Sequence, residues 1–368
     1  MDFVCQRDDF ARGITTVERA VSTKDNMPIL EGIYIRAHQD GLQLIATDLE
    51  MSIECSVPAR VEREGAAVLS GKVLGQIVRK FAGSEVTYRT AENGVAELAS
   101  GRSRFSVHTM PEDEFPALPE VDDEEMWRIP QGALRRMIRH TAFASAADES
   151  RPFLTGVLIE VDGDELRLVA TDSNRLAFHK GKLSQGAVQP RSGIVPVRAL
   201  VELMRILDAD EDSEVEFVVS HSQAVFRAPG VQMISRVIEG QFPDYRRVFP
   251  GQQPTRLRVD RAELLAAVER VSLIARRSTP VVRLSVSGNN LSLTSREAEV
   301  GHALEELAVV KEGDDQEAAY QSRYLAEALR AMDSDEVEVG LGHGLRQGSI
   351  APVGDENYLY IVMPVRVG

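Results

Sequence analysis

A chain of 368 residues, 43% of them hydrophobic, can bury several cores and has the length of two or three domains. No apolar run approaches the roughly 18 residues that cross a bilayer, and the N-terminus lacks a basic segment followed by an apolar one, so we expect neither a membrane span nor a secretory signal. The only cysteines, Cys5 and Cys55, are too few for a disulfide framework or a thiolate metal site, and they predict a cytoplasmic protein with reduced thiols. A net charge of −15 argues against a nucleic-acid partner only if the charge is spread evenly. Surface charges are screened beyond about 8 Å at physiological salt, so separate faces can differ in sign.

Three segments share the apolar period of an amphipathic helix. Residues 8–21 carry apolar side chains at spacings of four, three and four positions; residues 260–275 repeat the pattern, and residues 130–145 match it more weakly. A short strand is expected before each helix, with one apolar residue seven positions before the first apolar residue of the helix: Phe3, Trp127 and Leu257.

A strand motif recurs after each of these helices. The residues at 42–48 and at 166–172 both read Leu-x-Leu-x-Ala-Thr-Asp, at an offset of 124 positions, and a looser copy at 291–297 follows after 125 more. Alternation of apolar and polar residues predicts a half-buried strand, and the Thr-Asp end predicts the turn after it.

A second helix and a further strand complete each copy. The helices are predicted at 73–80, 200–207 and 325–332, and the strands at 85–88, 214–217 and 336–339. Because the landmarks recur in one order at nearly constant spacing, the sequence predicts an α+β fold of three tandem copies of one domain, with the helices gathered on one side of antiparallel sheets. Proline-rich linkers near 111–126 and 239–256, each with a Phe-Pro pair, set the expected domains at 1–120, 127–250 and 255–368.

No catalytic constellation is found in the sequence. The repeated acids Asp48 and Asp172 could be metal ligands of a hydrolase, but an Asp after a strand more commonly caps a turn, and that interpretation is favoured. The seven histidines lack metal-ligand spacing, and the glycines at 340–344 precede a strand, which favours a hairpin turn over a phosphate loop. We therefore expect no enzyme, no metal and no cofactor.

Basic residues occur on or beside all six predicted helices. Cations on one helix usually form a solvated face, but their recurrence on six helices suggests one shared basic surface, while the acids concentrate in linkers and turns. The basic residues are Arg12, Arg19, Lys72, Arg79, Lys80, Arg135, Arg136, Arg139, Arg198, Arg205, Arg270, Arg323 and Arg330, with Arg276 and Arg277 just beyond the helix that carries Arg270.

The whole chain resembles the bacterial replicative sliding clamps, the β subunits of DNA polymerase III. The resemblance rests on the triplication, the Leu-x-Leu-x-Ala-Thr-Asp motif, Ser-Gly-Arg-Ser-Arg-Phe-Ser at 100–106, Phe-Pro-Asp-Tyr-Arg-Arg-Val at 242–248 and Tyr-Ile-Val-Met-Pro-Val-Arg at 360–366. It implies a non-catalytic processivity factor of the polymerase III holoenzyme, a head-to-tail homodimer that forms a six-domain ring around duplex DNA. Helices would line the hole, so phosphates would meet basic residues there while the exterior stays acidic. The contacts would carry no sequence information.

The resemblance also implies which residues contact DNA and the second subunit. The expected DNA-binding residues are Lys24, Lys72, Arg79, Lys80, Arg139 and Arg198. One expected subunit edge carries Arg102, Arg104, Phe105 and Val107, and the other carries Leu273, Ile274, Glu297 and Glu299. Apolar contacts flanked by arginine against glutamate would close the ring by two equivalent interfaces.

Partners of such clamps are expected to insert a short linear peptide into an apolar pocket between the second and third domains. The pocket residues would be Leu154, Thr171, Leu176, Pro243, Val248, Ile361, Met363 and Pro364, with Arg175 and Arg366 at the rim. Implied partners are the clamp loader, the catalytic subunit of the replicative polymerase, and other polymerases or repair proteins.

Two other classes remain open at this stage. A metal-dependent nuclease would use Asp48 or Asp172 as ligands, and a β-rich peptide-binding scaffold would have the pocket but no ring. The first would lose activity on Asp172→Asn, and the second would sediment as a monomer.

Overall fold

The computed structural model describes residues 1–22, 27–91, 94–119, 126–209, 212–274, 280–297 and 299–366. Their contacts group the chain into two compact units, Met1–Gln131 with Arg205–Val237 and Gly132–Met204 with Ile238–Gly368. Among the described residues, no helix combines the length and apolar composition needed to cross a bilayer. Cys5 and Cys55 are free, buried thiols.

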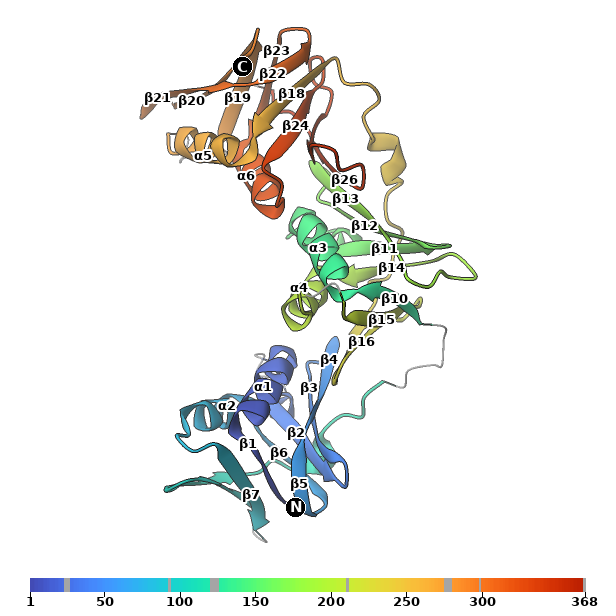
Figure 1. Cartoon of the computed structure of the whole chain (residues 1–368), viewed down its shortest axis with the longest axis vertical. Coiled ribbons are helices and arrows are strands. Elements are labelled where there is room, and N and C mark those ends of the chain that lie inside the picture. The colour runs from blue at the N-terminus through green and yellow to red at the C-terminus, as the bar shows by residue number, and fades with distance from the viewer. Residues whose placement is uncertain are drawn as a thin grey trace. The chain divides into compact units, whose positions relative to one another are not determined.

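The first unit has two antiparallel sheets and the helices α1 (Arg7–Val17) and α2 (Gly71–Lys80). The two helices lie together against one face of the sheets (Figure 1). A five-stranded sheet has the order β5-β1-β7-β8-β9, and an eight-stranded sheet has the order β10-β15-β16-β17-β4-β3-β2-β6. The strands are β1 (Asp2–Gln6), β2 (Gly32–His38), β3 (Gly41–Thr47), β4 (Met51–Val57), β5 (Ala59–Arg63), β6 (Gly65–Ser70), β7 (Glu85–Ala91), β8 (Val95–Ser100), β9 (Ser103–His108), β10 (Trp127–Pro130), β15 (Glu214–Val219), β16 (Gln223–Ala228) and β17 (Val231–Arg236).

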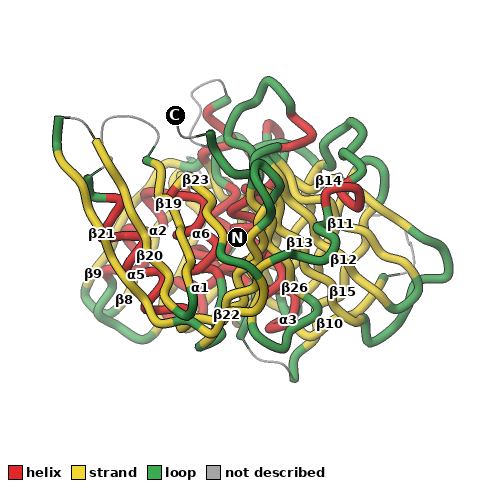
Figure 2. Tube along the Cα trace, turned by 90° about the horizontal axis from the view of Figure 1, so that it is seen from above, coloured by secondary structure: helices red, strands yellow, loops and turns green. Residues whose placement is uncertain are grey.

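The second unit is built in the same way. Its nine-stranded sheet has the order β14-β11-β12-β13-β26-β25-β24-β18-β22, and its four-stranded sheet the order β21-β20-β19-β23. The strands are β11 (Gly156–Asp162), β12 (Glu165–Thr171), β13 (Arg175–Lys182), β14 (Arg191–Pro196), β18 (Thr255–Asp260), β19 (Val281–Ser287), β20 (Asn290–Glu297), β21 (Gly301–Ala308), β22 (Val310–Gly313), β23 (Gln316–Gln321), β24 (Glu336–Leu341), β25 (Gly348–Pro352) and β26 (Tyr358–Val362). Its helices are α5 (Arg261–Ser272) and α6 (Ser322–Ala331), which cover one face of the four-stranded sheet (Figure 2). Helices α3 (Gln131–Thr141) and α4 (Val197–Ile206) each cross a boundary between the units.

Sheets continue from one predicted copy into the next. Strand β4 of the first copy pairs with β17 of the second, and β13 of the second pairs with β26 of the third. Each junction is an antiparallel ladder of five paired residues. This continuity explains why the two compact units divide the predicted middle copy.

The predicted helices and strands are confirmed, with small shifts at their ends. Helix α1 buries Phe10, Ile14 and Val17, as its apolar period predicts, but it ends at Val17 because the chain passes into a short 3-10 turn at Glu18–Ala20. In the third copy, the turn predicted at the end of the strand motif is wrong. Residues 296 and 297 are still strand there, since they pair with residues 302 and 301 of β21.

Candidate binding surfaces

The repeated Thr-Asp motif caps two equivalent turns. Asp48 Oδ1 accepts hydrogen bonds from the backbone N–H groups of residues 50 and 51, at 3.1 and 2.8 Å. Asp172 Oδ1 accepts from the N–H groups of residues 174 and 175, at 2.9 and 3.0 Å. The residues that the structure describes contain no group of three or more side chains suited to hold a metal. The structural interpretation of both acids is therefore confirmed, and the motif gives no support to a nuclease.

Arg175 is a buried hub rather than a rim residue. Its Nε donates to Asp172 Oδ2 at 3.0 Å, its Nη2 donates to the carbonyl oxygen of Phe143 at 2.6 Å, and its Nη1 pairs with Glu327. The guanidinium also lies over the ring of Tyr324, with 4.5 Å between Cζ and the ring centroid. Because its side chain is only 2% exposed, the expectation that Arg175 lies at the rim is wrong.

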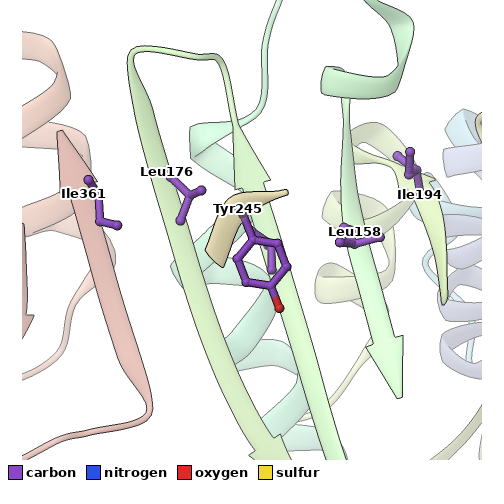
Figure 3. Packing of buried hydrophobic residues seen from close by; sticks show 6 residues of the cluster. Leu158, Leu176, Ile194, Tyr245 and Ile361 are labelled. Carbon is purple, nitrogen blue, oxygen red and sulfur yellow. The ribbon is translucent and has the colours of Figure 1, made fainter. Parts of the chain in front are cut away.

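Buried apolar side chains form a floor under the predicted pocket. Leu176 of β13 and Ile361 of β26 face each other in the ladder and share a cluster with Tyr245 (Figure 3). Leu158, Val169 and Ile194 complete this cluster. The predicted pocket residues Leu154 and Thr171 are also buried.

The remaining predicted pocket residues are accessible. Met363 and Val248 are 42% and 41% exposed, Pro243 and Arg366 are exposed, and Pro364 is half-buried. The backbone N–H of Met363 donates to the carbonyl oxygen of Asn174 at 2.8 Å, which fixes the C-terminal segment beside the turn between β12 and β13. The predicted set thus divides into a buried apolar floor and an accessible border.

A hydrogen-bond network anchors the linker that carries Pro243 and Val248. The Tyr245 hydroxyl donates to Glu160 Oε2 at 2.6 Å, and Arg246 reaches the same oxygen at 3.0 Å while its guanidinium lies over the Tyr245 ring. Burial and the bond to Glu160 raise the pKa of Tyr245 above its usual range, so the phenol stays a donor. Tyr245 and Glu160 were not predicted as supports of the pocket, although Tyr245 lies within the motif at 242–248.

Many of the helix arginines predicted to form a basic surface are paired with acids. Arg79 of α2 donates to both carboxylate oxygens of Glu18, at 2.8 and 3.3 Å, and the hydrogen bond to Glu18 raises the pKa of Arg79. At the equivalent place in the third copy, Arg330 donates to Glu269 at 2.6 Å. The acids were expected to concentrate in linkers and turns, but several, such as Glu18 and Glu269, lie on or beside the helices and pair with these arginines.

The six residues expected to contact DNA differ in their surroundings. Lys72 and Lys80 are exposed and form no ion pair with a carboxylate in the part of the chain that the structure describes. Arg198 is exposed, and Arg139 is half-buried and paired with Asp333, while burial lowers its pKa. Lys24 lies outside the described residues.

The predicted subunit edges are two unpaired sheet edges. Strand β9 ends the five-stranded sheet and β21 ends the four-stranded one. On and beside them Phe105 is 42% exposed and Leu273 is 52% exposed. Arg102, Arg104 and Glu299 are exposed, and Val107, Ile274 and Glu297 are half-buried. Leu304 of β21, which is 58% exposed, was not predicted, although the sequence shows it directly before the adjacent glutamates Glu305 and Glu306.

Comparison with known proteins places each copy in one family. Models of the N-terminal, central and C-terminal domains of the DNA polymerase III beta subunit match residues 1–119, 128–244 and 246–366. The chain is 33% identical to the beta sliding clamp of Staphylococcus epidermidis, over 100% of this chain and 99% of that protein.

The chain belongs to the DNA polymerase III beta subunit family, the beta sliding clamps.

Solved sliding clamps share the fold along the full length of both chains. The clamp of Bacillus subtilis superimposes with a TM-score of 0.95 at 31% identity, and a Pseudomonas aeruginosa clamp bound to griselimycin with 0.95 at 28%, each with 100% coverage of both chains. The predicted arrangement of three tandem clamp domains is confirmed. This sliding clamp is a processivity factor and not an enzyme.

A buried histidine pair lies at the other end of the strands that carry the pocket floor. The rings of His140 (α3) and His179 (β13) stack with centroids 4.8 Å apart, and the His140 ring lies 4.6 Å from that of Tyr358 (β26). Both nitrogens of His140 and Nδ1 of His179 lack a hydrogen-bond partner among the described residues. Burial lowers the pKa of His140 to about 3 and that of His179 to about 4. These values include smaller effects of nearby charges: His179, Arg139 and Arg136 also lower the pKa of His140, while at His179 Asp355 partly offsets the lowering and Arg136 adds to it.

We expect this pair to make the clamp sensitive to acid. Unfolding returns each pKa to about 6.5, so the unfolded state binds more protons at moderately acidic pH. The free energy of unfolding is therefore highest above pH 6.5, where both histidines are neutral in either state. It decreases as the pH falls from 6.5 toward the folded-state pKa values of about 4 and 3. Each histidine contributes a slope of up to about 1.4 kcal/mol per pH unit. Urea unfolding at several pH values should show a shallower acid slope for His140→Phe than for wild type; equal slopes would contradict this account.

Proposed function

We propose that two copies of this chain close into a ring around duplex DNA through the edges β9 and β21. The observation that carries the proposal is that a chain matching the clamp family over its whole length leaves both sheet edges unpaired, with Phe105 and Leu273 exposed beside them. Unpaired edges with exposed apolar residues invite a partner strand. Arginines on one edge and glutamates on the other give the joint complementary charge.

Several arginines of the helices that would line the ring are paired with carboxylates, so their contacts with DNA phosphates should be weak. A guanidinium that already shares a carboxylate, as Arg79 and Arg330 do, has less charge available for a phosphate. Tight contacts would slow sliding, whereas a closed ring is retained by topology. Lys72 and Lys80 of α2 are the strongest of the proposed contacts, because both are exposed without such a partner among the described residues.

We expect Lys72→Ala with Lys80→Ala to weaken DNA binding and its dependence on salt. Each phosphate contact removed should lower the slope of log K against log salt concentration by about 0.9. Fluorescence anisotropy of a labelled duplex over a salt series measures this slope. The control is Lys182→Ala, at the end of β13, where the lysine is 82% exposed and paired with Asp164. If the slope is unchanged in the double variant, or is lowered equally in the control, then α2 does not contact DNA.

The second proposed surface is the peptide pocket of the second unit. Its partners would be the clamp loader, the polymerase catalytic subunit, and other polymerases or repair proteins that carry a short linear motif. An apolar floor with an accessible methionine at its border suits several peptides in turn, because methionine adapts its shape. Because a bacterial replication clamp acts on the chromosome, which lies in the cytoplasm, we place the protein there.

The decisive experiment is retention on circular DNA. Clamps loaded onto a nicked circle should co-elute with it in gel filtration at high salt and be released once a restriction enzyme linearises it. Retention on the linear form would indicate binding by affinity, and release from the intact circle would exclude a closed ring.

A further inference from the structure

Several segments of the second unit meet at the guanidinium of Arg175. The turn after β12 supplies the Asp172 carboxylate, the segment after α3 supplies the carbonyl oxygen of Phe143, and α6 supplies the Glu327 carboxylate. Tyr324 of α6 adds its ring face at 4.5 Å. A buried charge must be paired and hydrogen-bonded to be tolerated, so these partners determine where the guanidinium lies.

The same turn holds the border of the proposed pocket. Asp172 uses Oδ1 to cap the turn and Oδ2 to bind Arg175. The carbonyl oxygen of Asn174 in this turn accepts from the N–H of Met363 at 2.8 Å. Ser173 between them has φ 78, in the left-handed region that favours glycine, so contacts with the surroundings must hold the turn in this conformation.

We propose that Glu327 of α6 is a positioning residue for the peptide pocket, acting through Arg175 on the turn that holds Met363. This inference rests on the proposed pocket. Glu327 belongs to none of the residue sets assigned to DNA, peptide or subunit binding. Its side chain is 26% exposed and lies in ion pairs with Arg175 and Arg323. Loss of its carboxylate leaves one side of the buried guanidinium without a partner, so Arg175 and the attached turn gain alternative positions.

A purely helical role for Glu327 is the competing explanation. Arg323 lies four residues before Glu327 on α6 and donates to its Oε1 at 2.7 Å, an exposed pair of the kind that stabilises a helix only weakly. The two partners differ in burial, since the side chain of Arg323 is 67% exposed and that of Arg175 is 2% exposed. Arg323→Ala therefore removes the helical pair and leaves the contacts of Arg175 intact, which makes it the matched control.

The test compares peptide affinity in full-length variants. As probe we take the tightest binder among fluorescein-labelled 12-residue peptides tiled across the cognate polymerase catalytic subunit, followed by anisotropy. Glu327→Ala should weaken binding about tenfold, equivalent to about 1.4 kcal/mol. Glu327→Gln should restore most of the affinity, because its amide oxygen can still accept from Arg175 Nη1. Arg323→Ala should bind as wild type does.

Each outcome decides between the explanations. Wild-type affinity in Glu327→Ala, or an equal loss in Arg323→Ala, would overturn the positioning role while leaving the pocket in place. Absence of peptide binding by the wild type would instead remove the pocket and this role with it. Thermal melting and sedimentation confirm that each variant is folded and dimeric. If Glu327→Ala does not fold, Glu327→Asp replaces it, since its shorter side chain withdraws the carboxylate from Arg175.

Discussion

Replacing Met363 and Pro364 together by alanine should strongly weaken peptide binding and leave the dimer intact. Met363 is 42% exposed beside the floor formed by Leu176 and Ile361, so it can be covered by a ligand but contributes little to the folded core. Loss of two apolar contacts at an interface costs about 2–3 kcal/mol, which corresponds to an affinity about 30- to 150-fold weaker. Peptide anisotropy measures the loss, and sedimentation velocity measures the dimer.

A matched substitution tests whether the effect belongs to this site. Val353 is another apolar residue of the second unit with a similar exposed fraction, 38%, and Val353→Ala should leave peptide affinity unchanged. If the double variant binds the peptide as tightly as the wild type, the pocket assignment is wrong.

A charge at Leu273 should convert the dimer into monomers. Leu273 follows α5 and is 52% exposed, and the proposed opposite edge carries Arg102, Arg104 and the exposed Phe105. Leu273→Arg removes an apolar contact and places a cation against two others, so we expect dimerisation to weaken at least 100-fold, equivalent to about 2.7 kcal/mol. Sedimentation at micromolar concentration should then show mainly monomer, and retention on circular DNA should be lost.

The same change at a distant leucine provides the control. Leu345 lies in the turn between β24 and β25 and is 46% exposed, so Leu345→Arg adds an equal charge at a similar exposure. It should remain a dimer. A Leu273→Arg variant that stays dimeric at nanomolar concentration would show that this edge does not form the joint.

Local periodicity was sufficient to predict the repeated elements. Helix α1 buries Phe10, Ile14 and Val17 at the spacing that the sequence shows, and the motif that ends in Asp172 forms a strand and a capped turn because its hydrogen bonds join near neighbours. The sheet order could not be read in this way. The junctions of β4 with β17 and of β13 with β26 join residues far apart in sequence, and no local pattern specifies such partners.

The limits of the site prediction have the same origin. Arg175 was expected at a rim from the resemblance to the clamp family, and its burial depends on Glu327, 152 residues away. Lys72 and Arg79 look alike as cations on one helix, yet only the folded chain brings Glu18 to Arg79. Charge counted along a sequence therefore overstates the charge that a folded helix offers to DNA.

The two junction ladders have a mechanical consequence for the assembled clamp. Repeats within one chain are joined by backbone hydrogen bonds, whose donors every residue except proline supplies. Side chains along these two ladders can therefore change in sequence without separating the repeats. The proposed joints between chains have no continuous chain beside them, and they rely on the strand edges together with a few particular side chains, such as Phe105 and Leu273. A clamp loader that strains the protein ring should therefore open it at an interface between the two chains. Mutations that alter ring opening should cluster at these two interfaces.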